Sequence, residues 1–109
     1  KIEGIFFPFD ENHPQAELAR SQMKRCSGLF SLTLRTDDAG VERFCDALNH
    51  FLIACSWGGY ESLVFPVAGL AIPPEKRNPL IPGNLVRIYI GIEDAELLSN
   101  DLLQALDKI

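Results

Sequence analysis

Arg87 occupies a position in which an arginine needs an anion. It lies in the apolar run 85–90, Leu-Val-Arg-Ile-Tyr-Ile, which is typical of a strand. Side chains of a strand point alternately to its two faces, and both faces of this run are largely apolar, so we expect both to be covered. A guanidinium charge there needs a partner of opposite charge. That partner is either a nearby acid such as Glu61 or the carboxylate of a ligand, and the residues alone leave both alternatives open.

A second candidate is the stretch 56–62, Ser-Trp-Gly-Gly-Tyr-Glu-Ser. It places the hydroxyl of Ser56 and the indole of Trp57 beside two adjacent glycines. Glycines let the backbone bend or approach a ligand closely, and Trp57 could then form a wall of the site. The alternative is a strand end with a tight turn and Trp57 in the core, which the residues alone favour because a buried tryptophan is ordinary.

The remaining reactive side chains do not form a recognisable site. His13 and His50 have no partner that the sequence suggests, so we interpret both as structural or solvated. The three cysteines are widely spaced without a Cys-x-x-Cys pair, which indicates neither disulfides nor a zinc site. We expect Cys45 and Cys55 to fill the core as small apolar residues. The four lysines lie at chain ends, a predicted helix end or a predicted loop, so we expect no catalytic, cofactor-binding or metal-binding residue here.

Composition and charge exclude several classes of function. The 109 residues fit a single domain, and with 47% apolar and 23% charged residues they can bury a core. A net charge of −5 argues against binding to nucleic acid or to anionic lipid. No run approaches the roughly 20 apolar residues of a membrane span, and the cysteine usage favours a reducing cytoplasm. Because the chain begins at Lys1 with a largely apolar segment, we expect it to be cut from a longer protein.

The elements that must position these residues alternate between strands and helices. Apolar residues at three- and four-residue spacing predict a helix over 41–53, and Pro14 at a first helical turn predicts another over 14–25. The alternation predicts an α/β fold, in the form of an α+β two-layer sandwich. The expected order is a strand over 1–9, a helix over 14–25, strand 29–34, helix 41–53, a short strand 63–65, a loop 66–83, strand 84–92 and a helix from 93 onward with Leu98, Leu102, Ala105 and Leu106 facing inward.

Three motifs in order along the chain resemble the Cys/Met-metabolism, or transsulfuration, family of pyridoxal-phosphate enzymes. Residues 13–32 resemble the beginning of that family's C-terminal domain. Residues 56–63, Ser-Trp-Gly-Gly-Tyr-Glu-Ser-Leu, resemble its Ser-Leu-Gly-Gly-x-Glu-Ser-Leu signature. Residues 85–94 resemble its closing motif, hydrophobic-Arg-x-x-x-Gly-hydrophobic-Glu. The resemblance covers nearly the whole chain.

The resemblance implies a fold and a set of site residues. Residues 1–109 would be the small C-terminal domain of an aspartate-aminotransferase-like fold, and the large domain with the cofactor lysine would lie outside the chain. Arg87 matches the residue that binds the α-carboxylate of the substrate, and Ser56 matches a serine that lines the same pocket. Trp57 matches the form of the signature in cystathionine beta-lyases, where most relatives have Leu. Residues 66–69, Pro-Val-Ala-Gly, depart from the usual Pro-Ala-x-x-Thr-His pattern, which weakens a match to gamma-synthases and gamma-lyases.

The resemblance also implies an activity and its partners. The full-length protein would be a pyridoxal-phosphate-dependent carbon–sulfur lyase that converts cystathionine to homocysteine, pyruvate and ammonia by β-elimination. The alternatives are a cystathionine gamma-synthase, cystathionine gamma-lyase or methionine gamma-lyase, or a non-catalytic interaction domain. The implied cofactor, pyridoxal phosphate, would be bound by the missing large domain. The implied partners are a sulfur amino acid, that large domain and further copies in a homotetramer, and the 109 residues alone would be inactive.

Overall fold

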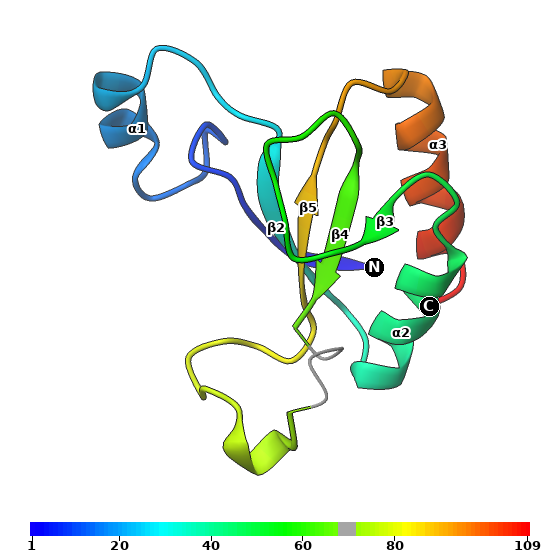
Figure 1. The fold of residues 1–109 in the computed structure, drawn as a ribbon. Coiled ribbons are helices and arrows are strands. Elements are labelled where there is room, and N and C mark those ends of the chain that lie inside the picture. The colour runs from blue at the N-terminus through cyan, green and yellow to red at the C-terminus, as the bar shows by residue number, and fades with distance from the viewer. Residues whose placement is uncertain (68–71) are drawn as a thin grey trace.

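The computed structural model describes residues 1–67 and 72–109, and these form a sheet with two helices packed on one face (Figure 1). This arrangement confirms the predicted α/β fold. The helices and strands, in chain order, are β1 (Ile2–Phe6), α1 (Ala16–Gln22), β2 (Leu29–Leu34), α2 (Asp38–Ala47), β3 (Leu52–Ile53), β4 (Leu63–Pro66), the 3-10 helix η2 (Pro74–Lys76), β5 (Leu85–Tyr89) and α3 (Ala95–Leu106).

The sheet has five strands in the order β1-β2-β5-β4-β3. Strand β5 is central and pairs antiparallel with β2 on one side and with β4 on the other. β1 pairs antiparallel with β2, whereas the short edge strand β3 pairs parallel with β4. The strand that carries Arg87 is therefore held by hydrogen bonds on both edges.

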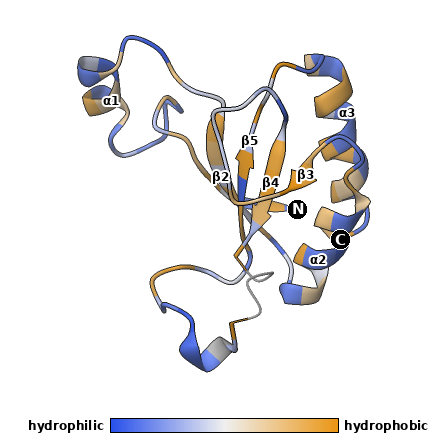
Figure 2. Cartoon of the chain, in the orientation of Figure 1, coloured by the Kyte–Doolittle hydropathy of each residue, from blue (hydrophilic) through white to orange (hydrophobic). Residues whose placement is uncertain are grey.

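The core lies between the sheet and the pair α2 and α3. Val86 and Ile88 on β5 are fully buried there, as are Val41 and Phe44 on α2. Figure 2 shows the corresponding apolar colouring along the central strands and on parts of α2 and α3. On α3 the predicted inward positions are confirmed, because Leu98 and Ala105 are buried and Leu102 and Leu106 pack against the core. No helix of the described residues is long and apolar enough to cross a membrane.

The predicted helix over 41–53 is wrong at both ends. α2 begins at Asp38 because the side chain of Asp37 caps it, accepting the backbone N–H of Gly40 at 2.9 Å. It ends at Ala47, since Leu48 is extended. Phe51 still reaches the core, but Leu52 and Ile53 form β3 and are 61% and 58% exposed.

The outer segments are shorter than the sequence predicts. α1 covers only Ala16–Gln22 of the expected 14–25, because Met23 is extended. It stands away from the sheet in Figure 1, at the end of the segment that follows β1. Strand 1–9 is observed as Ile2–Phe6, and strand 84–92 as Leu85–Tyr89.

Of the predicted loop 66–83, Pro66 ends β4, and residues 72–83 form a surface loop that contains η2. Residues 68–71 lie outside the described part, and with them Ala68 and Gly69 of the unusual 66–69 pattern. Arg77 fixes the loop to the start of α2 by an ion pair with Asp38 at 2.7 Å. The sequence predicts the loop but not this anchor.

Candidate functional site

The sheet face opposite α2 and α3 carries one row of side chains across four strands. Phe6, Ser31, Arg87 and Phe65 are successive cross-strand partners from β1 to β4. Their half-buried or exposed side chains contrast with the neighbouring β5 positions, which are fully buried on the helix face. Our expectation that both faces around Arg87 are covered is therefore wrong for the described residues, because only one face has helices on it.

Two contacts hold the guanidinium of Arg87. Its Nη2 donates to the backbone carbonyl of Cys55 at 2.6 Å, and its central carbon lies 5.1 Å from the centre of the Phe65 ring. Such a cation–π contact orients the planar group without neutralising it. Within residues 1–67 and 72–109 no carboxylate, that of Glu61 included, forms a salt bridge with Arg87. A free anion could therefore bind the nitrogens Nε and Nη1, which donate to no described residue.

The segment beside Arg87 contains the other two candidate residues. Ser56 and Trp57 directly follow Cys55, whose carbonyl Arg87 binds, and both are exposed. Trp57 is 62% exposed, so the interpretation of this residue as part of the core is wrong. Cys55 is also exposed rather than in the core, whereas Cys45 is buried, and burial beside Asp46 raises the pKa of its thiol to about 12.

The loop 54–62 is fastened at its far end by a buried hydroxyl. Ser62 is fully buried, and both its backbone N–H and its hydroxyl donate to the Glu93 carboxylate at 2.8 Å. The Ser62 hydroxyl in turn accepts the backbone N–H of Gly91 at 2.9 Å. The hydrogen bond from the Ser62 backbone, more than any other contact, lowers the pKa of Glu93, against the opposing effect of desolvation.

Two further hydrogen bonds join the middle of this loop to β5 and the residues after it. The hydroxyl of Tyr89 donates to the carbonyl of Gly59 at 3.0 Å, and the backbone N–H of Ile92 donates to the carbonyl of Tyr60 at 2.9 Å. These supporting residues were not predicted from the sequence. No local sequence pattern signalled them, because their side-chain contacts join residues 29 to 31 positions apart in the chain.

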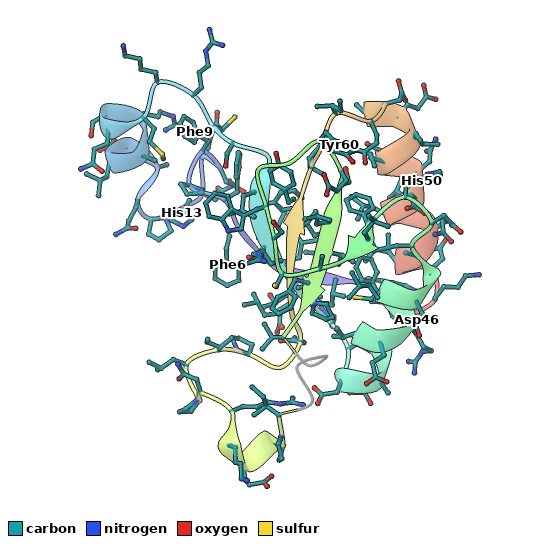
Figure 3. All side chains as sticks on the ribbon, in the orientation of Figure 1. Phe6, Phe9, His13, Asp46, His50 and Tyr60 are labelled. Carbon is teal, nitrogen blue, oxygen red and sulfur yellow. The ribbon has the colours of Figure 1, made fainter. Side chains whose placement is uncertain are left out.

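The two histidines do not contribute to this arrangement. His13 precedes α1 and its Nδ1 accepts the backbone N–H of Gln15 at 3.2 Å, whereas His50 is exposed near α3. Figure 3 shows the two side chains on opposite sides of the sheet. The described structure thus brings Arg87, Ser56 and Trp57 to one region and leaves the histidines outside it.

A family model for Cys/Met-metabolism PLP-dependent enzymes, PLP being pyridoxal phosphate, matches residues 1–107. The chain belongs to this family. Its relatives include the cystathionine gamma-lyase of Bacillus subtilis, which is 38% identical over 99% of the chain, and the cystathionine beta-lyase of Lactococcus lactis, which is 35% identical over 98% of the chain. The L-alanine/L-glutamate racemase of Wolbachia pipientis is 36% identical over the whole chain.

The solved structures agree with the family assignment. The cystathionine gamma synthase of Xanthomonas oryzae, in complex with cystathionine, superposes with a TM-score of 0.87 at 36% identity over 98% of the chain. The metB protein of Corynebacterium glutamicum gives a TM-score of 0.83 at 35% identity over 97%. The chain of 109 residues spans only 28% or 29% of the length of these two proteins and of the three relatives above.

No lysine of this chain lies in the region of Arg87. Pyridoxal phosphate is held in enzymes by a lysine Schiff base. All four lysines here, Lys1, Lys24, Lys76 and Lys108, are exposed and lie outside the region of Arg87, as none comes from loop 54–62 or from β5. The chain therefore supplies no lysine site for the cofactor.

Proposed function

We propose that this chain is the substrate-recognition domain of a pyridoxal-phosphate-dependent carbon–sulfur lyase, and that Arg87 binds the α-carboxylate of the substrate. The observation that carries the proposal is the arginine itself. It is held in place by the Cys55 carbonyl and the Phe65 ring, yet has no carboxylate partner among the described residues. A positioned guanidinium with free donors is suited to two parallel hydrogen bonds with a carboxylate.

In this proposal the residues of the chain bind and orient the substrate without transferring protons. Arg87 fixes the carboxylate end, Ser56 directly follows the Cys55 that Arg87 binds and offers a hydroxyl, and the exposed indole of Trp57 limits the space for the substrate side chain. Such contacts contribute by positioning the substrate for a reaction carried out elsewhere. The cofactor and its lysine then belong to residues outside this chain.

The apolar surface supports a second part of the proposal, namely that a larger domain of the same protein covers this chain. An open hollow of about 500 Å³ lies beside β1 and is lined mainly by Ile5, Phe7, Phe30 and Ile90. Phe6 is half exposed on the opposite face of the sheet, in the row that contains Arg87. Exposed apolar surface of this kind is typical of a face that packs against a partner. Residues 1–109 would accordingly form a single small domain.

β-Elimination from cystathionine is the first candidate reaction, and its support is Trp57, which matches the beta-lyase form of the signature. The products would be homocysteine, pyruvate and ammonia. γ-Elimination or γ-replacement is the second candidate, because relatives named gamma-lyases or gamma-synthase are as similar to this chain as the beta-lyases are. A carboxylate clamp fits the substrate of each. The homotetramer and the cytoplasmic location remain predictions.

The product of cystathionine cleavage tests the choice between these reactions. The full-length protein that contains this chain should be incubated with cystathionine and pyridoxal phosphate, and its oxoacid product identified by mass. Pyruvate indicates β-elimination, whereas 2-oxobutyrate indicates γ-elimination. If neither forms and Arg87→Ala leaves the binding of cystathionine unchanged, the proposed function is wrong.

A further inference from the structure

Every second residue from Arg87 to Glu93 contacts the loop that contains Trp57. Arg87 binds the carbonyl of Cys55, Tyr89 binds the carbonyl of Gly59, and both Gly91 and Glu93 bind Ser62. The first and last of these contacts hold the two ends of the loop. The Tyr89 hydroxyl is the side-chain contact that reaches its middle.

The middle of the loop is where the backbone is least restrained by its own sequence. Gly58 has a φ of +85°, a conformation that residues other than glycine rarely adopt, and apart from its chain neighbours no described residue has an atom within 4 Å of the point where a Cβ would be. Two consecutive glycines leave Trp57 attached to a turn with wide conformational freedom. A hydrogen bond to the carbonyl of Gly59 removes part of that freedom.

We propose that Tyr89 is a positioning residue, which fixes the Gly58–Gly59 turn so that the indole of Trp57 stays at a set place relative to Arg87. The inference rests on the proposed function, because it assigns the hydroxyl a role in the choice of substrate. Tyr89 and Arg87 project from the same face of β5, two residues apart, and each grips the loop on one side of Trp57. The two side chains together determine the distance from the Arg87 guanidinium to the Trp57 indole.

The contacts of Ser62 make the effect of Tyr89 local. The Glu93 carboxylate and the backbone N–H of Gly91 hold the loop end without help from Tyr89. Loss of the phenolic hydroxyl therefore frees the Gly59 carbonyl, while the backbone hydrogen bond from Ile92 to Tyr60, the strands β4 and β5 and the Arg87 contacts stay in place. Tyr89→Phe is the matching change, since it removes one oxygen and keeps the ring.

The experiment compares Tyr89→Phe with Tyr60→Phe, its control. Tyr60 is the other tyrosine of the chain, is 73% exposed, and its hydroxyl donates to no described residue. In the full-length enzyme we expect Tyr89→Phe to change the ratio of kcat/KM for cystathionine to that for cystine by about 3–10-fold, chiefly through KM, as loss of one neutral hydrogen bond implies. Tyr60→Phe should match the wild type.

A double-mutant cycle with Trp57→Leu separates positioning from a general loss of stability. If the hydroxyl acts through Trp57, Tyr89→Phe should change the substrate ratio by less than about 2-fold once Trp57 is Leu, because coupled residues are not additive. An equal effect in both backgrounds, or the same effect from Tyr60→Phe, overturns the proposal.

A measurement independent of activity distinguishes a failure of this inference from a failure of the proposed function. Trp57 is the sole tryptophan of the 109-residue chain. In the full-length protein, subtracting the signal of the Trp57→Leu variant isolates the fluorescence of Trp57, and its quenching by acrylamide then reports the turn. Tyr89→Phe should increase the quenching constant and Tyr60→Phe should not. Unchanged quenching in Tyr89→Phe overturns the positioning role even where the enzyme is active. Increased quenching alongside Arg87→Ala kinetics that match the wild type supports the positioning of Trp57 and contradicts the proposed function instead.

Discussion

The carboxylate of Asp101 on α3 accepts the backbone N–H of His50 at 2.8 Å. It also accepts the backbone N–H of Asn49 at 3.0 Å and the side-chain amides of Asn49 and Gln104 at 3.2 and 3.0 Å. Asp101 is only 4% exposed, and burial by itself would raise its pKa, but these hydrogen bonds together lower it. A single buried carboxylate thus joins α3 to the segment between α2 and β3.

Asp101→Asn should destabilise the chain by about 1–3 kcal/mol, because the amide keeps the shape but cannot accept all of these hydrogen bonds. Urea unfolding followed by circular dichroism measures the change. Asp107→Asn, at the exposed end of α3, is the matched control and should unfold like the wild type. Equal midpoints for the two variants would contradict the assigned role.

The same carboxylate predicts a loss of stability in acid. Its folded-state pKa lies below the ordinary value of 3.8, so its contribution is present above that value and is lost as the pH falls through the folded pKa. The difference in unfolding free energy between wild type and Asp101→Asn should therefore shrink below about pH 4. A difference that stays constant from pH 6 to pH 2 would show that the charge does not matter.

The Asp101 contacts also explain why the sequence predicted too long a second helix. The apolar spacing of Val41, Phe44, Leu48 and Phe51 continues the period of α2 past its end. The Asp101 carboxylate, 52 and 51 positions away, accepts the backbone N–H groups of Asn49 and His50, so these groups have hydrogen-bond partners without a helix. Local periodicity contains no information about such a distant acceptor. The pattern therefore identifies Val41, Phe44 and Phe51 of the core correctly, but it gives the helix end wrongly and includes Leu52, which is 61% exposed, in the buried stripe.

Arg87→Ala in the full-length enzyme should cost about 2–5 kcal/mol in substrate recognition, seen as a lower kcat/KM for cystathionine. Arg87→Lys should restore this in part only, because an ammonium lacks the planar fork. Arg43→Ala, which removes an exposed arginine on α2, is the control and should keep wild-type kinetics. Equal kinetics for Arg87→Ala and Arg43→Ala would exclude Arg87 from the site.

Trp57→Leu should shift the preference among sulfur amino acids while general eliminase activity is kept, because it reshapes a wall without removing a charge. The measurement is kcat/KM for cystathionine, cystine and methionine in parallel. The expected change in their ratios is about 10-fold, the usual effect of altering one apolar contact. Ratios equal to those of the wild type would count against Trp57 as a determinant of specificity.

The 109-residue chain mixed with pyridoxal phosphate should form no specific Schiff base, because its four lysines are exposed and lie apart from Arg87. Absorbance spectroscopy and mass spectrometry after borohydride reduction measure this. A modification confined to one lysine, and abolished by replacing that lysine with Ala, would place a cofactor site within the chain. Scattered, weak modification of several lysines is the expected background.

For the site, the sequence could predict the parts but not their support. The alternation around Arg87 identified a charge without an evident partner, and the motifs pointed to Ser56 and Trp57. Nothing in the local pattern indicates that Tyr89 reaches Gly59 or that Glu93 binds Ser62, since the two residues of these pairs lie 30 and 31 positions apart in the chain, respectively. The exposure of Trp57 was also beyond the sequence, because its surroundings are set by how loop 54–62 crosses to β5.

Alternate residues of strand β5 face opposite sides of the sheet and have different roles. Val86 and Ile88 are sealed in the core, whereas Arg87 and Tyr89 serve the opposite face. Under the proposed function, we expect substitutions at Arg87 and Tyr89 to alter substrate choice while Val86 and Ile88 keep the core intact. A one-residue insertion or deletion within the strand has the opposite result, because it would exchange the two sets and place a guanidinium among the core side chains. Members of this lineage should therefore diverge here by replacement and never by a change in length.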